Sequence, residues 1–329
     1  MSTLGVSFTD GALESRVLAG IGEVETQLSA AVESPDALLS EAAAHLLNAG
    51  GKRFRPLLVL LSAEFGDPSQ ADVARSAVVV ELTHLATLYH DDLMDEADKR
   101  RGAHSANERW GNSVAILVGD YLFAQASELV SYLGSEAVRI QARTFSRLVQ
   151  GQIRETIGPA PDEDALAHYL EVVADKTGSL IATASLFGAK MAGASTDVQE
   201  TLTEFGERIG AAFQLADDII DVASETGDSG KTPGTDLREG VPTLPTLIAL
   251  RSTEPEGERL RSLLSRPLTD DAEHAEALTL LRAHPAMAEA RAYVQAEADA
   301  ASVLLAKLPD IAARAALQEL CDTVVNRLG

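Results

Sequence analysis

The chain has 329 residues, a formal net charge of −23 at pH 7 and an isoelectric point near 4.6, and 46% of its residues are hydrophobic. This composition excludes general disorder, and the strong acidity argues against nucleic acid or an anionic membrane surface as a partner. The single cysteine, Cys321, excludes an internal disulfide and a cysteine-rich metal site, and it suits a reducing cytoplasm. The sequence shows neither a signal peptide nor a run of the roughly 18 uninterrupted apolar residues that a transmembrane segment needs.

Apolar residues recur at helical spacing through almost the whole chain, and alternating strand patterns bounded by hairpin turns are absent. In chain order, the predicted helices span 12–33, 36–48, 56–65, 68–96, 112–133, 135–157, 163–191 and 196–223, with several more in 242–328. For the helix over 68–96, Asp67 is the candidate N-cap and Gln70 its partner in a capping box. The helices are rich in alanine and poor in aromatic residues, which predicts a closely packed all-α bundle.

One irregular segment, 224–243, is both long and rich in glycine and polar residues. A segment of this kind is often a linker to a second domain. The composition does not change across it, however, so we interpret it as a loop at the mouth of a single domain over 1–329. No internal repeat of fixed period is visible.

The stretch HDDLMDEADKRRG, residues 90–102, places Asp91, Asp92 and Asp95 close together on one predicted helix. Residues four apart share a helix face, so Asp91 and Asp95 are stacked and their carboxylates repel unless a cation lies between them. Hard oxygen ligands of this kind suit Mg²⁺, which binds a few carboxylates, several waters and phosphate oxygens. The simpler alternative is a solvated, charged helix end.

The same D-D-x-x-D spacing recurs in QLADDIIDV, at Asp217, Asp218 and Asp221. One such match is a weak signal, but two in apolar helical settings are expected by chance on the order of 0.01 times or fewer. Both copies lie near a predicted helix end. We therefore predict that two antiparallel helices hold a shared metal cluster across the top of the bundle.

Basic residues are concentrated in two places in this acidic chain, Lys52-Arg53-Phe54-Arg55 and Lys99-Arg100-Arg101. Guanidinium groups can bind a diphosphate bidentately, and GGKRFRP at 50–56 opens a helix after a flexible Gly-Gly. One anion site rich in metal and one without metal favour an enzyme that joins two diphosphate substrates. The metals would withdraw diphosphate from one substrate, and cations alone would hold the substrate that keeps its own.

Six motifs between Gly50 and Pro245 resemble, in order and spacing, those of trans-type polyprenyl diphosphate synthases of the isoprenoid synthase superfamily. They are GGKRFRP, HLATLYHDDLMDEADKRRG, GQIRE, DKTGSL, FQLADDIIDV and GKTPGTDLREGVPTLP. The resemblance implies the all-α isoprenoid synthase fold, an antiparallel helical bundle around a deep central cavity, usually as a homodimer. It also implies a Mg²⁺-dependent head-to-tail condensation of isopentenyl diphosphate with an allylic diphosphate by ionisation, condensation and elimination.

The resemblance assigns roles to individual residues. Asp91, Asp95 and Asp217 would ligate a trinuclear magnesium cluster, supported by Asp92, Asp218 and Asp221. The allylic diphosphate would be held by Arg100, Lys176, Thr177, Gln214 and Lys231. Isopentenyl diphosphate would be held by Lys52, Arg55, His84 and Arg101, with Gln152 lining the same cavity. Without the resemblance, His84 is interpreted as a buried helix histidine and each single lysine as a surface residue.

One position departs from the family pattern. The second loop commonly reads E-G-K before its T-L-P, whereas this chain has Glu239-Gly240-Val241. A lysine that would reach the allylic diphosphate is therefore missing, while Lys231 remains. We expect weaker binding or altered loop closure rather than an inactive protein.

Product length is expected to depend on Thr83, Ala86 and Thr87, one and two turns before Asp91. Short-chain members have a bulky aromatic residue there, so small residues predict a medium- or long-chain product such as a quinone side-chain precursor. Alternatively, Ala86 and Thr87 only pack helices, and the chain is a farnesyl or geranylgeranyl synthase or a non-catalytic partner subunit of a heteromeric synthase. A terpene cyclase usually has a different second metal motif and lacks GGKRFRP, and a purely structural protein explains neither the duplicated motif nor the two cation sites.

Overall fold

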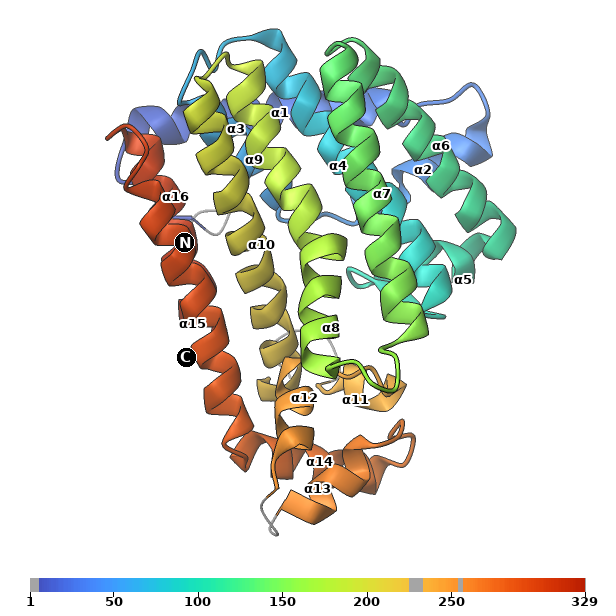
Figure 1. Ribbon diagram of the computed structural model, residues 1–329. Helices are drawn as coiled ribbons and strands as arrows, with labels where there is room; N and C mark the ends of the chain where they lie inside the picture. The colour runs from blue at the N-terminus through green and yellow to red at the C-terminus, as the bar shows by residue number, and fades with distance from the viewer. Residues whose placement is uncertain (1–5, 225–232, 254–256, 329) are drawn as a thin grey trace. The chain divides into compact units, whose positions relative to one another are not determined.

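The computed structural model describes residues 6–224, 233–253 and 257–328, and it confirms the predicted all-α class (Figure 1). The helices are α1 (Gly11–Ala31), α2 (Ala37–Asn48), α3 (Phe54–Ala63), α4 (Ala71–Met94), α5 (Ala106–Trp110), α6 (Asn112–Ser131), α7 (Ser135–Ile157), α8 (Ala165–Val173), the π-helical turn η1 (Ala174–Gly178), α9 (Ser179–Met191), α10 (Thr196–Ala223), α11 (Thr235–Glu239), α12 (Leu244–Arg251), α13 (Glu258–Leu264), α14 (Asp271–Ala283), α15 (Ala286–Leu305) and α16 (Ala312–Asn326). Within the described ranges, the strands are β1 (Lys99–Arg100) and β2 (Ala103–His104), which pair as a small antiparallel hairpin.

The internal contacts group the chain into two compact units. Unit 1 comprises Met1–Ser146, Leu180–Gly206 and Leu304–Glu319. Unit 2 comprises Arg147–Ser179, Glu207–Val303 and Leu320–Gly329. The single domain over 1–329 stays a prediction.

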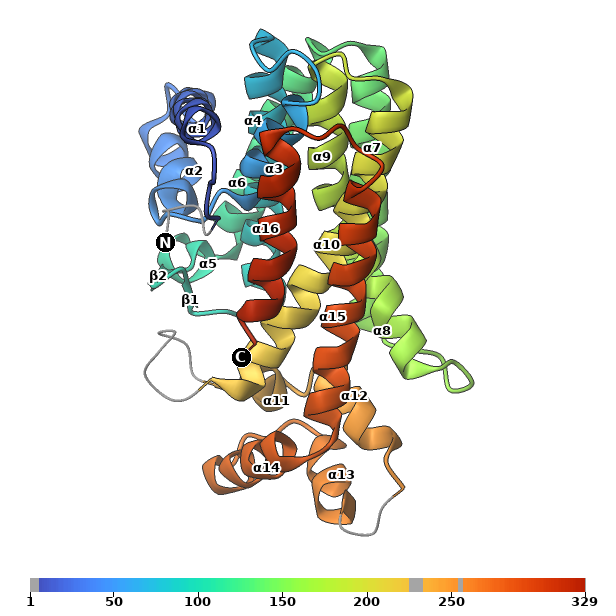
Figure 2. The same ribbon diagram turned by 90° about the vertical axis from the view of Figure 1, so that its left-hand side faces the viewer.

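The core of unit 1 is built around α4, which packs against α1, α3, α5 and α6. Because α4 has neighbours on several sides, its apolar residues are buried around most of its circumference rather than along one stripe. Figure 2 shows α1 and α2 next to each other, and Asp10 and Asp36 cap their N-termini by accepting backbone N–H bonds. Gly188 of α9 lies against the backbone of Val59 on α3, where a Cβ would collide with the carbonyl group. Close helix packing of this kind follows from the small residues in the sequence.

Unit 2 includes the second half of α7, η1 and the C-terminal half of α10. Helix α8 contacts α12, and α12, α13 and α14 form a group of short helices (Figure 2). Asp164 caps α8 by accepting the backbone N–H bonds of Leu166 and Ala167. These elements position the second aspartate motif and the DKTG segment.

Three predicted elements differ from the observed ones. Helix α4 begins at Ala71, because the Asp67 carboxylate accepts from the Ser69 backbone N–H at 3.0 Å and from the Gln70 side chain, forming a local turn instead of a helix cap. The predicted helix over 163–191 is divided by the π-helical turn η1. The described part of the predicted loop over 224–243 contains the short helix α11.

Helix α6 is, among the described residues, long and apolar enough to cross a membrane by length and composition alone. No such segment was expected from the sequence. The finding is weak evidence for a membrane span, since core helices of other proteins satisfy the same test. Two of its apolar side chains, Ile116 and Leu117, are 43% and 64% exposed.

Candidate active site

The first aspartate motif lies at the C-terminal end of α4, in unit 1. Asp91 and Asp92 belong to the last turn of the helix and Asp95 is its C-cap residue, so the negative end of the helix dipole disfavours all three carboxylates. Asp92 is fully buried, and the Arg100 side chain donates to its Oδ1. Its Oδ2 is buried without a hydrogen-bond partner among the described residues. Burial raises the pKa of Asp92, and Arg100 opposes that shift.

The GGKRFRP loop before α3 has a backbone conformation with positive φ values, which residues other than glycine rarely adopt. Gly50 and Gly51 have φ values of 92° and 146°, and Arg53 has φ 48° in the left-handed region. A Cβ on Gly51 would lie 2.9 Å from guanidinium atoms of both Arg53 and Arg101. Arg101 in turn donates to the carbonyl groups of Gly50 and, at 2.9 Å, of Leu46. Glycine at position 51 therefore allows two guanidinium groups to approach the loop.

Arg53 is bound inside unit 1 rather than directed to solvent. Its Nη1 donates to Glu81 Oε1 at 3.2 Å, its Nε to Glu25 Oε1 at 2.5 Å and its Nη2 to the Leu47 carbonyl at 3.1 Å. The side chains of Arg53 and Glu81 are 5% and 2% exposed, whereas that of Glu25 is 40% exposed. Arg53 therefore anchors the loop to the interior of unit 1, while its neighbour Lys52 is exposed.

Glu81 is the anion at the centre of several cations. Burial lowers the pKa of Arg55 to about 10, and the charge of Glu81 opposes this shift. Burial also lowers the pKa of Arg101, again against the effect of Glu81. His84, one turn after Glu81 on α4, has a pKa well below its ordinary value because it is buried and surrounded by guanidinium groups, first of all that of Arg55. A neutral His84 can donate a hydrogen bond to a phosphate oxygen without adding charge to the cluster.

The second aspartate motif occupies the last two turns of α10, in unit 2: Asp217, Asp218 and Asp221. Asp218 is 6% exposed and accepts hydrogen bonds from the Tyr169 hydroxyl and, at 2.9 Å, from Gln214 Nε2. Burial raises the pKa of Asp218 to about 6, and the two hydrogen bonds oppose the shift. Thr177 Oγ1 donates to Gln214 Oε1 at 3.0 Å. Three residues predicted to act at this site therefore form one hydrogen-bonded chain.

A cavity of about 230 Å³ lies beside this chain in unit 2. Residues from the predicted set that line it are Lys176, Thr177, Gln214 and Asp218. Lys176 Nζ is 2.5 Å from Glu155 Oε2, also on the cavity wall. Val241, which replaces the family lysine, lines the same cavity and is 38% exposed. The structure thus brings Lys176, the carboxylates of Glu155, Asp218 and Asp236, and an apolar wall to one cavity.

The other two aspartates of the second motif have protein partners in this structure. Arg327 Nη2 is 2.5 Å from Asp217 Oδ1, and Arg327 Nη1 is buried without a hydrogen-bond partner among the described residues. The Arg327 guanidinium also lies over the Phe213 ring, 5.1 Å from its centroid. Asp221 accepts the backbone N–H of Thr235 at 3.3 Å. A guanidinium therefore lies where the sequence predicts a metal ligand.

The chemistry of the donors fits magnesium. Within the described ranges, no three His, Cys, Asp or Glu side chains converge closely enough to form a metal site by themselves. Magnesium does not require such a cage, because it keeps several waters and is commonly bound by one or two carboxylates together with substrate phosphates. The partnerless Oδ2 of Asp92 and the arginine on Asp217 both mark places where positive charge is favourable.

The positions expected to set product length lie in the core of unit 1. Thr83 and Ala86 are fully buried and Thr87 is 8% exposed. Thr83 Oγ1 accepts from Gln141 Nε2 of α7 at 2.6 Å, and Thr87 donates to the His84 carbonyl. These contacts are those of packed helix residues, and the role of the three positions in chain length stays a prediction.

Two predicted residues lie outside the groups described so far. Lys231 is not among the described residues. Gln152 is half-buried on α7, its side-chain oxygen has no hydrogen-bond partner among the described residues, and it does not line the 230 Å³ cavity. The sequence did not indicate Glu81, Tyr169 and Arg327, because each contacts a site residue that is distant in the sequence. The only available signal was a charged or polar residue inside an otherwise apolar helical pattern.

Comparisons with known proteins identify the family of the chain. The sequence profile of the polyprenyl synthetase family matches residues 36–281, well over half of the chain. Nonaprenyl diphosphate synthase of Mycobacterium tuberculosis is 52% identical over 326 residues, 99% of this chain and 97% of that protein. Dimethylallyltranstransferase of the same organism is 42% identical over 322 residues, 98% of each chain.

Among solved structures, geranylgeranyl pyrophosphate synthase from Corynebacterium glutamicum, complexed with calcium and isoprenyl diphosphate, superposes with a TM-score of 0.89. It is 47% identical, and the match covers 98% of this chain and 100% of that one. The isoprenoid synthase fold expected from the motifs is confirmed. This chain belongs to the polyprenyl synthetase family and is a prenyltransferase.

Proposed function

We propose that the protein is a Mg²⁺-dependent polyprenyl diphosphate synthase that condenses isopentenyl diphosphate with an allylic diphosphate and releases a medium- or long-chain all-trans product. The observation that carries the proposal is the cavity in unit 2, where Lys176, Thr177, Gln214 and Asp218 converge. A diphosphate has the charge and oxygen ligands that such a group of residues binds.

In the reaction, the C1–O bond of the allylic diphosphate breaks and inorganic diphosphate leaves. The double bond of isopentenyl diphosphate attacks the resulting carbocation, a C–C bond forms, and a proton is lost to the departing diphosphate. Asp91, Asp95 and Asp217 would hold Mg²⁺, which would neutralise charge on the leaving group. Lys176, Thr177 and Gln214 orient the leaving diphosphate, with Arg100 and Lys231 as further ligands. Stabilisation of developing charge accounts for most of the rate.

Isopentenyl diphosphate would be held by Lys52, Arg55, His84 and Arg101. The loop geometry supports this assignment, because Gly51 allows the Arg101 guanidinium to approach the loop, where it donates to the Gly50 and Leu46 carbonyls. A substrate bound by cations alone keeps its own diphosphate, as the reaction requires. Gln152 remains assigned to this part of the site.

The product class is supported by the small residues at Ala86 and Thr87 and by the similarity to a nonaprenyl diphosphate synthase. A short-chain product is the second candidate, because the similarity to a geranylgeranyl pyrophosphate synthase is nearly as high. We also expect a cytoplasmic homodimer, in which a partner would cover the exposed Ile116 and Leu117 of α6. Light scattering on the purified protein measures the dimer directly.

The test is elongation by the purified protein with Mg²⁺, isopentenyl diphosphate and geranyl, farnesyl or geranylgeranyl diphosphate in turn, with product sizing by mass spectrometry. We expect products longer than geranylgeranyl diphosphate. Arrest at farnesyl or geranylgeranyl diphosphate would establish the short-chain alternative. No elongation by the protein alone would favour a partner-subunit role.

A further inference from the structure

Lys176 and Thr177 lie in η1, the π-helical turn between α8 and α9. Turns of this type are rare and occur mostly as single insertions in α-helices, often at functional sites. The hydrogen bond that closes η1 runs from the Ser179 backbone N–H to the Ala174 carbonyl. The side-chain contacts that surround η1 lead to the opposing helix α7.

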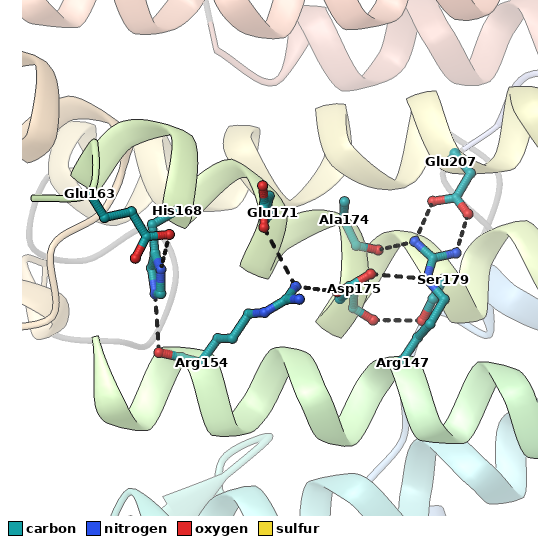
Figure 3. A network of polar contacts seen from close by, with 9 residues as sticks. All are labelled: Arg147, Arg154, Glu163, His168, Glu171, Ala174, Asp175, Ser179 and Glu207. Carbon is teal, nitrogen blue, oxygen red and sulfur yellow. Dashed lines mark hydrogen bonds and ion pairs between the residues drawn. The ribbon is translucent and has the colours of Figure 1, made fainter. Parts of the chain in front are cut away.

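Asp175, the residue before Lys176, is held by two arginines of α7. Its Oδ1 accepts from Arg147 Nε at 2.9 Å, and its Oδ2 accepts from Arg154 Nη1 at 2.7 Å. The arginines are two helical turns apart and therefore lie on one face of α7. We call Arg147, Arg154 and Asp175 the α7 bridge, and Figure 3 shows their side chains pointing toward one another.

Arg147 extends the contacts to a third helix. Its Nη1 is 2.5 Å from Glu207 Oε1 of α10, and its Nη2 donates to the Ala174 carbonyl at 3.4 Å (Figure 3). Glu207 lies two turns before Gln214 on α10, and Gln214 accepts the hydrogen bond of Thr177. The turn η1 is thus fixed by α7 at Asp175 and by α10 at Thr177.

Gly151, between the two arginines on α7, allows this approach. A Cβ at this position would lie 2.7 Å from the Lys176 backbone nitrogen and 3.0 Å from Asp175 Cβ. The backbone of α7 therefore lies directly against the peptide that carries Lys176. A larger residue would separate α7 from η1 and lengthen both bonds of the bridge.

The bridge side chains are accessible enough to solvent that a role in positioning can be distinguished from a role in folding stability. Arg147 and Arg154 are each 41% exposed, and Asp175 is 19% exposed. Ion pairs this accessible to solvent contribute little to the free energy of folding. They still restrict orientation, because both oxygens of one carboxylate are bound by separate guanidinium groups.

We propose that the α7 bridge is a positioning device for the allylic diphosphate site. Arg147 and Arg154 hold Asp175 so that η1 keeps its π-helical register, which keeps Lys176 and Thr177 on the wall of the 230 Å³ cavity. A change from π to α register displaces one residue, a rotation of about 100° around the helix axis. None of the three bridge residues lines the cavity, and the inference rests on the proposed function of this cavity.

The first experiment needs no substrate or metal. Amide hydrogen exchange is followed by mass spectrometry on peptides that cover residues 174–178, for the whole protein and its Asp175→Asn, Arg147→Met and Arg147→Lys variants. We expect faster exchange in this segment for Asp175→Asn and Arg147→Met, and an intermediate rate for Arg147→Lys, which keeps the charge but not the fork. The control is Arg259→Met, which removes a comparably exposed ion pair to Glu276 elsewhere in unit 2. Exchange at 174–178 that matches the wild type in every variant would overturn the inference.

The second experiment measures KM separately for the two substrates. Misplaced binding groups raise KM for the allylic diphosphate by about ten- to hundredfold in Asp175→Asn and Arg147→Met, while KM for isopentenyl diphosphate stays within about twofold. The thermal midpoint is recorded for each variant, and Arg259→Met keeps both KM values. Equal rises in the two KM values, or none, would overturn a positioning role. A wild-type protein without condensation activity would instead refute the proposed function. The exchange experiment would still test whether the α7 bridge fixes residues 174–178.

Discussion

The buried pair of Arg53 and Glu81 allows the stability loss of a Glu81 variant to be predicted. Replacing Glu81 by Gln removes the central anion of a cluster that includes Arg53, Arg55 and Arg101. The Arg53 and Glu81 side chains are 5% and 2% exposed, so the loss leaves excess positive charge in a cluster that is away from water. Removing one member of such a buried pair destabilises a protein by about 3–5 kcal/mol. Glu25→Gln removes the other carboxylate bound to Arg53, which is 40% exposed, and should cost about 0–1 kcal/mol.

Urea unfolding followed by far-ultraviolet circular dichroism measures both variants at fixed ionic strength. The double variant Glu81→Gln, Arg53→Met should be less destabilised than the sum of its single variants, because it removes a charge with its partner. In functional assays, Glu81→Gln should raise KM for isopentenyl diphosphate more than KM for the allylic diphosphate. If Glu81→Gln and Glu25→Gln lower the free energy of unfolding by the same amount, the cation cluster does not depend on Glu81.

Three further predictions concern product length, the cavity and the metal. Ala86→Phe should shorten the product, as measured by mass spectrometry; unchanged products accompanied by a stability loss of about 1–3 kcal/mol would show that Ala86 only packs helices. Val241→Lys adds a cation to the cavity wall and should lower KM for the allylic diphosphate about tenfold, and a rise would contradict the binding of this diphosphate in the cavity that Val241 lines. Arg327→Met removes the guanidinium on Asp217 and should lower the Mg²⁺ concentration for half-maximal binding by calorimetry about two- to fivefold; an unchanged titration would show that Asp217 is not a metal ligand.

The parts of the structure that follow from local pattern could be predicted from the sequence. Helix α10 spans 196–223, as its apolar periodicity indicates, and both aspartate motifs lie at helix ends. The π-helical turn η1 could not be predicted, because residues 165–173 and 179–191 have one uninterrupted helical pattern. Its register depends on contacts with Arg147 and Gly151, which belong to another helix. The same reason explains the misplaced start of α4, where Asp67 forms a turn with its own neighbours.

Side-chain roles inside GGKRFRP show the same limit. Three cations in four positions predict an anion site, but the spacing does not distinguish the cation that anchors the loop from those that face a ligand. That distinction comes from φ at Arg53 and from Glu81, which lies on a different helix. A buried acid three residues before His84 carries no local signal, since one polar residue in an apolar helix usually has an unrelated partner.

Burial divides the six aspartates into two groups with different chemistry. The middle aspartate of each motif is buried, Asp92 fully and Asp218 at 6% exposed, and each is bonded by a side chain from another element. Burial raises the pKa of both carboxyls, so holding them charged requires positive charge nearby. Asp217 is 41% exposed and is paired with Arg327. A metal would therefore bind the more accessible aspartates directly. Asp92 and Asp218 would connect the helix ends to neighbouring elements and add negative charge that attracts cations. This division predicts that Asp92→Asn retains more metal affinity than Asp91→Asn.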